Sequence, residues 1–394
     1  MSVPQAPRVA VVLRHGLNPD RWRERHERGE VVDETPYGYH LAGDEFDLVW
    51  STDHAESGLA RRWRSAVRKA LGFDLVHVWR NRAIIAGADV VWTHTEREHL
   101  AVALLKRLRP NTYRAALLAQ SIWLWDDWPD LPAARRALWS RLLPEAWIEV
   151  VHSRLNLERS RTAVPGRRTA LLPFGTHFAT ARMDRASAAA GAGAEASARP
   201  RVLVIGNDRH RDWPLLVEAA ARRPQLDFEI LSLADAVRAL SWPANATVRS
   251  FHQREIVETR YAEADVVAIP LLSNVHVSGC TVAIEARSAG VPVVATDVGG
   301  IDDYLEGAVA ALVPEGDVDA FVAAIDRFLD APRPSADDLA EAARAAAEHG
   351  IEHLDYVERY AALTRAIFAG EEPPEQASRF ERMPRAAART EATT

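Results

Sequence analysis

Residues 264–305, ADVVAIPLLSNVHVSGCTVAIEARSAGVPVVATDVGGIDDYL, contain two short apolar runs separated by a helical pattern. Val266–Ile269 and Val291–Ala295 have the length and apolar character of buried strands. Between them, Thr281–Ala289 places small and apolar side chains at helical spacing, and Gly290 ends the helix. The stretch therefore predicts a βαβ crossover in a buried parallel sheet, and with it an α/β fold.

The loop that enters this helix, residues 273–280, has the features of a ligand-binding loop. A helix amino terminus offers unpaired N–H groups and partial positive charge, which suit a phosphate. Gly279 lets the backbone approach a ligand, and Thr281 can cap the helix or donate its hydroxyl group. Glu285 follows one turn later and can accept hydrogen bonds from a ribose diol. The candidate binding residues in this loop and helix are Ser278, Gly279, Cys280, Thr281 and Glu285.

The segment from Ser278 to Leu305 resembles the donor-site segment of retaining glycosyltransferases of the GT-B fold, family 4, also described as glycosyl transferases group 1. The family pattern is a Glu, seven residues, a second Glu, a small-residue helix, G-x-P-V-V-A-T and a Gly-Gly turn. Glu285 matches the second Glu, and Val277, preceded by His276, stands where the first Glu touches the donor sugar in the family. The alternative is a βαβ unit of another kind of α/β protein. The other matching positions are Gly290, Pro292, Gly299 and Gly300.

The resemblance implies two Rossmann-like, doubly wound parallel-sheet domains that face a central cleft. Residues 1–183 would form the acceptor-binding domain and residues 201–350 the nucleotide-sugar donor domain, which 394 residues can accommodate. We expect residues 184–200, rich in Gly and Ala, to be a flexible linker. Residues 351–370 would form a terminal helix that returns to the first domain, and residues 371–394 a disordered tail.

A strand at Arg201–Gly206 opens the second domain and is followed by NDRHRD. In the family, basic residues of this loop grip the donor diphosphate, so Gly206, Arg209 and Arg211 are candidate donor contacts. A guanidinium group matches phosphate oxygens in a fork. The sequence leaves open which arginine points inward, and a solvated Arg-rich turn is the alternative. Phe251 falls where the base-binding loop of the family begins.

Polar residues also follow the strands predicted in the first domain. Arg14, His15 and Gly16 come directly after the strand Arg8–Leu13, so they are candidates for acceptor contacts. His94 follows the strand Asp89–Thr93 and is the leading acceptor-side polar residue, although it could equally cap a helix or bond to backbone.

The segment QSIWLWDDW, after the strand Ala115–Ala119, carries further candidates for acceptor binding. Trp123, Trp125 and Asp126 could line a sugar pocket, because aromatic faces stack on sugar rings. They could equally belong to a packed loop. Gln120 stands where the family often has a His near the reacting centre.

The two halves of the chain differ in charge. Residues 1–183 contain 27 Lys and Arg against 21 Asp and Glu, whereas the remainder contains 21 against 34. A basic first half suits an anionic acceptor or membrane surface, although arginines scattered over the surface and solvated would give the same charge balance.

Leu59–Leu71 is a basic amphipathic helix with Trp63 and Val67 on one side, which could pack on the sheet or lie on a membrane. Without a basic stripe that carries aromatics, nucleic acid is not an expected partner.

Several classes of site and location are excluded by the sequence. The single cysteine, Cys280, cannot form an internal disulfide and argues against a Cys-built zinc site. Asp317-Val318-Asp319 has the D-x-D spacing of metal-dependent glycosyltransferases. Because it precedes a helical pattern, capping of that helix and compensation of its dipole explain the two aspartates, so no metal site is expected. No run of about 18 apolar residues occurs. We expect a cytoplasmic protein, with peripheral contact at the inner face of the membrane as an option.

The sequence thus predicts transfer of a sugar from a nucleotide-diphosphate sugar, UDP-sugar first, with retention of configuration and no cofactor or essential metal. Candidate catalytic residues are His94, Arg209, Arg211 and His276. Charge on the leaving diphosphate would be stabilised by arginine and helix amides. An epimerase or hydrolase on the same scaffold, or an inactive nucleotide-sugar-binding protein, are the alternatives, and the acceptor is unknown.

Overall fold

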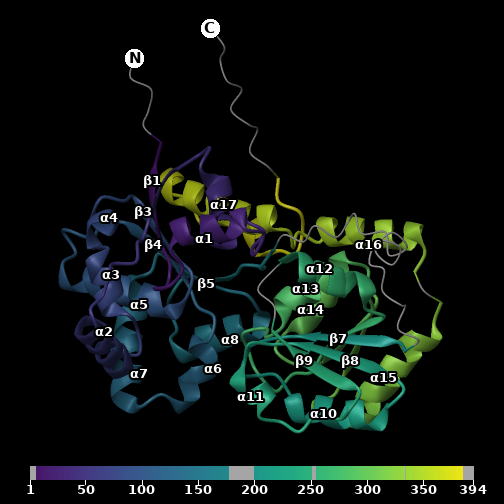
Figure 1. Cartoon of the computed structure of the whole chain (residues 1–394). Coiled ribbons are helices and arrows are strands. Elements are labelled where there is room, and N and C mark those ends of the chain that lie inside the picture. The colour runs from purple at the N-terminus through teal and green to yellow at the C-terminus, as the bar shows by residue number, and fades with distance from the viewer. Residues whose placement is uncertain (1–5, 177–198, 251–253, 333, 385–394) are drawn as a thin grey trace.

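The computed structural model describes residues 6–176, 199–250, 254–332 and 334–384, and this part of the chain contains two β-sheets with helices packed against them (Figure 1). Each sheet has six strands in the described residues, and all of their neighbouring strands are parallel. The predicted α/β architecture of two doubly wound domains is confirmed.

The first sheet has the strand order β2-β1-β3-β4-β5-β6. The order reverses between β1 and β3, so the chain leaves these neighbouring strands in opposite directions and a crevice forms at their carboxyl ends. The strands are β1 (Arg8–Val12), β2 (Asp47–Trp50), β3 (Val90–Thr93), β4 (Ala116–Gln120), β5 (Ile148–Val151) and β6 (Thr169–Leu171).

The second sheet has the strand order β12-β11-β10-β7-β8-β9, with its reversal between β7 and β10. The strand predicted at Val291–Ala295 begins two residues later, at Val293, because Pro292 has no N–H group to donate. The strands are β7 (Arg201–Ile205), β8 (Asp227–Leu231), β9 (Ala246–Arg249), β10 (Val266–Ile269), β11 (Val293–Thr296) and β12 (Ala310–Val313).

Helices cover both faces of each sheet, and several begin at a side-chain cap such as Ser57, Thr95 or Ser153. In the first domain they are α1 (Pro19–Glu27), η1 (Pro36–Ala42), α2 (Gly58–Leu71), α3 (Leu75–Arg80), α4 (Arg82–Ala86), α5 (Glu96–Leu108), α6 (Leu124–Asp127), η2 (Trp128–Asp130), α7 (Ala133–Leu142), η3 (Leu143–Glu145) and α8 (Arg154–Ala163). Later in the chain they are α10 (Trp213–Arg222), α11 (Asp235–Arg238), α12 (Arg254–Glu263), α13 (Cys280–Ser288), α14 (Ile301–Leu305), α15 (Val318–Asp330), α16 (Ala336–Glu348), α17 (His353–Ala369) and η5 (Glu375–Ser378).

Asp317 caps α15, because its Oδ1 accepts a hydrogen bond from the backbone N–H of Ala320 at 2.9 Å. The interpretation of the D-x-D segment as a helix start is therefore confirmed. Among the described residues, no helix is both long enough and apolar enough to cross a bilayer.

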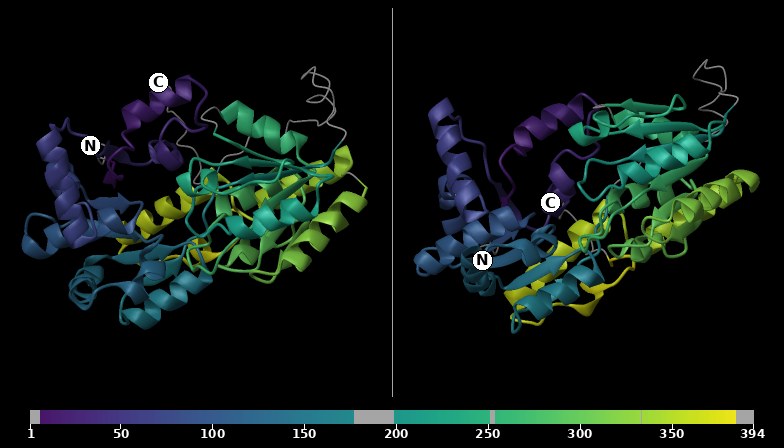
Figure 2. Two further views of the ribbon diagram at one scale, coloured as in Figure 1. Left: turned by 60° about the horizontal axis from the view of Figure 1, so that its bottom comes forward. Right: turned by 90° about the horizontal axis from the view of Figure 1, so that it is seen from below.

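The last helix, α17, packs on the first domain although it follows the second in the chain (Figures 1 and 2). Tyr356 and Tyr360 lie in the same apolar core as Trp92, and Trp92 Nε1 donates a hydrogen bond to Thr364 Oγ1 at 2.9 Å. This helix therefore ties the two domains together through the end of the chain.

Residues 371–384 were predicted to be disordered, and this is wrong. The reason is Arg359 of α17, which is fully buried and donates to the carbonyl groups of Arg379 and Glu381, both at 3.0 Å. Its other amino group donates to the carbonyl of Gly350 at 2.8 Å. The predicted linker falls almost entirely outside the described residues, as do Phe251 and residues 385–394.

Candidate functional site

Two loops meet at the reversal point of the second sheet. Residues 206–212 follow β7 and residues 270–279 follow β10, and the two strands are paired neighbours. Backbone hydrogen bonds join the loops, from Asp212 N to the Pro270 carbonyl at 3.1 Å and from Leu272 N to the His210 carbonyl at 2.8 Å. Ligands of open α/β sheets bind at such a point. The donor contacts predicted from sequence therefore lie where the topology favours a binding site.

Arg211 points inward from the first loop, and its guanidinium group lies between two glycines. A Cβ atom on Gly206 would lie 2.4 Å from Arg211 Nε, and one on Gly279 would lie 3.1 Å from Nη1. The side chain is buried, and Nε and Nη1 have no hydrogen-bond partner in the described part of the chain. Burial lowers the pKa of Arg211 to about 10, so the group stays charged at neutral pH. The charge of Asp208 offsets this burial only in part, and Nε and Nη1 keep unused donors, so this loop favours an anionic ligand.

The amino terminus of α13 faces the same glycine. Gly279 is the N-cap with φ of 89°, and no side chain caps the helix. Of the two roles considered for Thr281, the cap is excluded because Gly279 takes that position, whereas Thr281 lies exposed in the first turn and could still donate its hydroxyl group. Ser278 Oγ is buried and has no partner among the described residues. Burial raises the pKa of the Cys280 thiol to about 11, so the thiol stays neutral.

Glu285 and Val277 differ in what surrounds them. Glu285 is buried in α13, and its Oε2 accepts a hydrogen bond from the Tyr261 hydroxyl at 2.7 Å. Val277 has a φ of 54° and contributes its side chain to an apolar core of the second domain. A β-branched residue rarely adopts this conformation, so the turn before α13 is strained. The residue at the position of the first family Glu therefore packs in the core.

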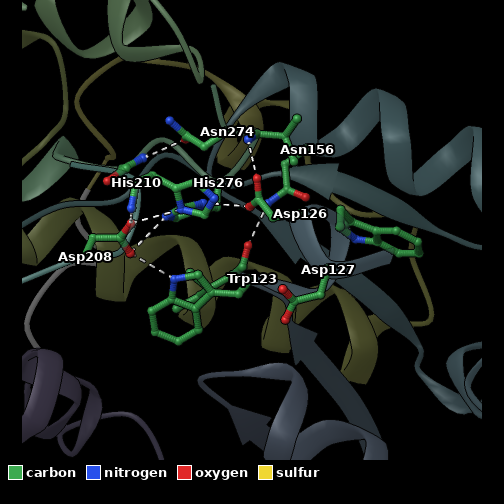
Figure 3. Close-up of polar contacts among 12 residues, drawn as sticks. Trp123, Asp126, Asp127, Asn156, Asp208, His210, Asn274 and His276 are labelled. Atoms are coloured by element: carbon green, nitrogen blue, oxygen red, sulfur yellow. Dashed lines mark hydrogen bonds and ion pairs between the residues drawn. The ribbon is translucent and has the colours of Figure 1, made fainter. Parts of the chain in front are cut away.

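His276 lies at the contact between the two domains and between two carboxylates (Figure 3). Its Nδ1 is 2.6 Å from Asp126 Oδ2 of the first domain, and its Nε2 is 3.2 Å from Asp208 Oδ2 of the second. Burial alone would lower the pKa of His276, but the hydrogen bonds and charges of the two carboxylates outweigh it and raise this pKa to about 9. Asp126 Oδ1 also accepts the backbone N–H of Val275 at 2.7 Å. The loop before α13 is thus held against the first domain.

A cavity of about 550 Å³ lies between the domains beside this contact. Trp123 borders it from the first domain, and its Nε1 donates to Asp208 Oδ2 at 3.2 Å. Arg209 borders it from the second domain and is paired with Asp127 at 2.5 Å. Arg14, also in the lining, is exposed after β1. The cavity therefore brings together predicted donor-side and acceptor-side residues.

His15 and Gly16, the other residues predicted after β1, contact the first domain itself. The ring of His15 packs edge-on against His77, and its Nε2 is 4.0 Å from Glu56. The backbone N–H of Gly16 donates to Asp53 at 3.1 Å. Neither residue is among those that line the interdomain cavity.

The structure contradicts one further candidate and favours a packed role for another. Trp125 was predicted to line an acceptor pocket, and this is wrong because its ring is fully buried and its Nε1 donates to Glu149 Oε1 at 3.0 Å. His94 was predicted to contact the acceptor, but it is buried and stacked on Tyr37 with ring centroids 3.4 Å apart. Burial holds the pKa of His94 well below its ordinary value. Its neighbour Gln120 donates to its backbone carbonyl at 2.9 Å, so His94 belongs to a packed network.

Sequence reasoning did not identify Asp208 or His210 as site residues. Both lie in the loop after β7, beside the two arginines that were identified, and Asp208 contacts residues of both domains. Their position at the carboxyl end of a strand was the available signal. The missing information was that His276 from a distant loop lies next to them.

Comparison with known proteins supports the assignment of the second domain. Residues 199–331 match the family model described as Glycosyl transferases group 1. No curated protein sequence matches the chain. The matched residues include both loops and α13, so the family likeness covers the candidate site.

Solved structures share the fold over nearly the whole chain. Sucrose-phosphate synthase from Thermosynechococcus elongatus has a TM-score of 0.70 at 18% sequence identity, and the match covers 92% of this chain and 100% of that chain. Alpha,alpha-trehalose 6-phosphate synthase from Burkholderia multivorans has a TM-score of 0.63 at 13% identity, covering 92% and 99%. HepE from Anabaena, in complex with UDP and glucose, has a TM-score of 0.61 at 13% identity, covering 91% and 99%. At these identities the likeness shows the fold.

Proposed function

We propose that this chain, a glycosyltransferase of the GT-B fold with a group 1 domain at residues 199–331, transfers a sugar from a nucleotide-diphosphate sugar to an acceptor with retention of configuration. UDP-sugars are the first donors to test, because HepE, which has the same fold, was solved in complex with UDP and glucose. The reaction as proposed does not require a metal ion, since protein groups supply the positive charge.

One observation carries this proposal, namely the enclosed guanidinium group of Arg211 beside the uncapped amino terminus of α13. The diphosphate of the donor provides the anion that Nε and Nη1 of Arg211 lack among the described residues. A guanidinium group binds phosphate oxygens in a fork, and helix amides add further donors. Gly206 and Gly279 allow this close approach, because a Cβ atom on either would meet Arg211.

The same groups explain how the chain would promote transfer. Negative charge grows on the diphosphate as the bond to the sugar breaks, and Arg211 with the α13 amides stabilises that charge in a site removed from water. Glu285, held by Tyr261, would accept the ribose hydroxyls. The contacts of Asp126 and Trp123 with the second domain keep the domains together, which excludes water that would hydrolyse the donor.

The acceptor would enter from the interdomain cavity. Trp123 provides an aromatic face and Arg14 a positive charge in its lining. Sugar rings stack on aromatic faces, and an arginine suits a phosphate or carboxylate of the acceptor. The acceptor is therefore proposed to be a glycan, lipid or small molecule that offers a hydroxyl group at this cavity.

The test is a two-stage assay. A thermal-shift screen of UDP, GDP and ADP identifies the base, because a ligand that binds only the folded state raises the melting temperature. Nucleotide sugars with the favoured base are then incubated with and without acceptors. Release of nucleotide that requires an acceptor supports transfer, whereas release without one supports a hydrolase and an isomerised sugar supports an epimerase. No shift with any nucleotide contradicts the donor site.

A second candidate, a nucleotide-sugar-binding protein without transferase activity, is favoured by Val277. This residue replaces the family Glu that touches the donor sugar, and it packs in the core. Substitution of Val277 with Glu separates the two candidates, provided that the variant folds by circular dichroism. The second candidate is supported if the wild-type chain binds the donor but forms no product with any acceptor, and if the variant gains turnover.

We also propose that α2 contacts an anionic membrane surface. The alternative, in which this helix packs on the sheet, holds for Leu71, which lies against the core, but not for Leu59 and Trp63, which are 78% and 60% exposed. The helix is anchored from its other side by Arg64, which is buried and donates to Asp74 at 2.6 Å. Its remaining basic residues are Arg61, Arg62, Arg68 and Lys69. An exposed apolar strip among basic residues is typical of interfacial helices.

Vesicle co-sedimentation tests this contact. We expect the protein to bind vesicles with anionic lipid at low salt, and Trp63→Ser to weaken binding about 5- to 30-fold, since a buried aromatic ring contributes about 1–2 kcal/mol. Trp79→Ser is the matched control. Trp79 is 51% exposed but belongs to α3 instead of α2, and the guanidinium group of Arg82 covers its ring. Equal binding to neutral vesicles, or equal loss in both variants, contradicts the proposal.

A further inference from the structure

Three side chains that can bind a metal ion converge where the two loops of the second domain meet. One ligand atom from each of Asp208, His210 and His276 lies within 4.8 Å of the others. His210 Nδ1 is 3.1 Å from Asp208 Oδ1, and His276 Nε2 is 3.2 Å from Asp208 Oδ2. Ligands at 2.0–2.1 Å from a tetrahedral Zn²⁺ ion are separated by about 3.3 Å. Two of the three ligand pairs, each to a different oxygen of Asp208, are therefore near the spacing of a zinc site, and the third pair lies within 4.8 Å.

The surroundings of these residues match the support that metal ligands require. A histidine that binds a metal through one nitrogen usually donates its other N–H to a carboxylate, which orients the ring. Asp126 does this for His276 at 2.6 Å, and Trp123 Nε1 supports Asp208 at 3.2 Å. Asp208 Oδ1 also accepts the backbone N–H of His210 at 2.8 Å. Figure 3 shows this arrangement, in which His276 lies between Asp126 and Asp208.

Burial and access also suit a bound ion. The side chain of His276 is 4% exposed, whereas those of Asp208 and His210 are 20% and 17% exposed. Asp208 lines the interdomain cavity, which gives an ion and its water ligands a path to the cluster. Imidazole nitrogens with a carboxylate oxygen form the donor set that suits Zn²⁺ and similar divalent transition metals, and Mg²⁺ or Ca²⁺ would prefer oxygen ligands alone.

We propose that Asp208, His210 and His276 bind a divalent transition-metal ion, with Zn²⁺ as the best match. The three ligands come from the loops after β7 and β10, so the ion joins these loops at their meeting point. Asp126 and Trp123, which support the ligands, belong to the first domain. The ion is therefore bound most tightly when the two domains are in contact, and it stabilises that arrangement. The chemistry of transfer does not run through it.

The experiment uses the full chain with any affinity tag removed. Zn²⁺ binding is measured by equilibrium dialysis with elemental analysis, and Co²⁺ is used as a spectroscopic probe of the coordination. We expect about one ion per chain, a Co²⁺ absorption spectrum of mixed nitrogen and oxygen ligands, and a higher melting temperature with the ion.

Three variants locate the ion. His210→Ala removes a ligand and should weaken binding at least about 10-fold, and Asp126→Asn should weaken it about 10- to 100-fold through loss of ligand orientation. His54→Ala is the control, because His54 is an exposed histidine outside the cluster. Circular dichroism verifies folding, and Asp126→Asn keeps all three ligands in place if His210→Ala is unstable.

The inference does not rest on the proposed function, because metal binding is measured without nucleotide. Binding of fewer than about 0.1 ions per chain would overturn it, since a three-ligand zinc site should be close to fully loaded. Unchanged affinity in both His210→Ala and Asp126→Asn would also overturn it and would assign the ion to other residues. In either case the cluster is a set of salt bridges between protein side chains, without a metal ion.

Discussion

Two buried cations lie in neighbouring loops of the second domain, and they differ in what surrounds them. His276 contacts carboxylates from both domains, whereas Nε and Nη1 of Arg211 have no partner in the described residues. The carboxylates raise the pKa of His276 to about 9 against the effect of burial, and burial lowers that of Arg211 to about 10. In the metal-free protein the first cation is satisfied by the protein and joins the domains, and a bound metal ion would replace its Nε2 proton. The second retains unused hydrogen-bond donors, which a ligand can satisfy.

The largest effect is expected from Arg211→Met. Donor affinity should fall at least about 100-fold, because about two charge-assisted hydrogen bonds of about 1.5–3 kcal/mol each are lost. The melting temperature of the free protein should stay constant or rise, since an unpaired buried charge is replaced by an apolar chain of similar length. Calorimetric titration with nucleotide and thermal unfolding measure the two quantities.

Arg211→Lys is the matched variant, because it keeps the charge and removes the fork. It should recover only part of the affinity, since a compact ammonium group reaches fewer phosphate oxygens. Unchanged donor affinity in Arg211→Met would contradict the assignment of this cation to the diphosphate. A strongly lowered melting temperature in the free protein would show that Arg211 is a structural residue.

Gly279→Ala tests the space around the unpaired cation. The added Cβ atom would lie 2.8 Å from Ile269 Cγ2 and 3.1 Å from Arg211 Nη1, and φ is 89°. We expect a loss of about 2–3 kcal/mol of stability, from backbone strain and steric overlap together, and weaker donor binding. Urea unfolding and nucleotide titration provide the measurements.

Gly16→Ala is the control for the backbone contribution. Its φ is 101°, but a Cβ atom there would have no neighbour within 4 Å. It should therefore lose only about 1–2 kcal/mol, with donor affinity unchanged. Equal effects of the two substitutions on donor affinity would contradict a specific role for Gly279.

The structure brings together more of the predicted donor-side residues than of the predicted acceptor-side residues, for a physical reason. Gly206, Arg211 and Gly279 act through one local arrangement at the ends of two paired strands, and strand patterns locate such ends. Trp125 was misassigned because an aromatic residue near a predicted crevice can equally point into the core, and periodicity does not fix its direction. The packed surroundings of His94 were not predictable because they come from a distant segment, in which Tyr39 Oη lies 3.2 Å from His94 Nδ1.

Contacts between distant segments were not predictable from sequence. The pairing of His276 with Asp126 depends on how the two domains sit against each other. The ordered segment after Gly370 depends on Arg359, whose burial against backbone carbonyls gives no signal in the local pattern. Local patterns were enough to predict an α/β fold, and the resemblance to a known family supplied the two-domain architecture, which was predicted correctly.

Glu98→Gln extends the comparison to a buried anion. Glu98 is fully buried in α5 and accepts a hydrogen bond from Thr95 Oγ1, but no described cation is paired with it. Burial raises the pKa of Glu98 to about 8, so the carboxyl group is protonated and neutral at pH 7. Arg211, in contrast, keeps its charge at this pH. The unfolded chain releases that proton near pH 4.3, so stability is lost as the pH rises from about 4.3 towards 8.

The Gln variant is neutral at every pH and escapes that loss. We expect the advantage of Glu98→Gln over the wild type in unfolding free energy to grow by about 3–4 kcal/mol from pH 5 to pH 8. Urea unfolding of both proteins at the two pH values measures this difference. If the difference in unfolding free energy between the two proteins is the same at both pH values, Glu98 is ionised in the folded protein, and the prediction is wrong.

The smallest effect is expected from Arg209→Ala. The sequence offered Arg209 and Arg211 as equal candidates, but Arg209 is 56% exposed and already paired with Asp127, itself 44% exposed. Exposed ion pairs contribute about 0–1 kcal/mol, so stability should change by less than that and donor affinity by less than about 5-fold. Calorimetric titration at low and high salt measures both the affinity and its screening. A loss as large as that of Arg211→Met would move the diphosphate from the enclosed guanidinium to the interdomain cavity, because only there can Arg209 reach it.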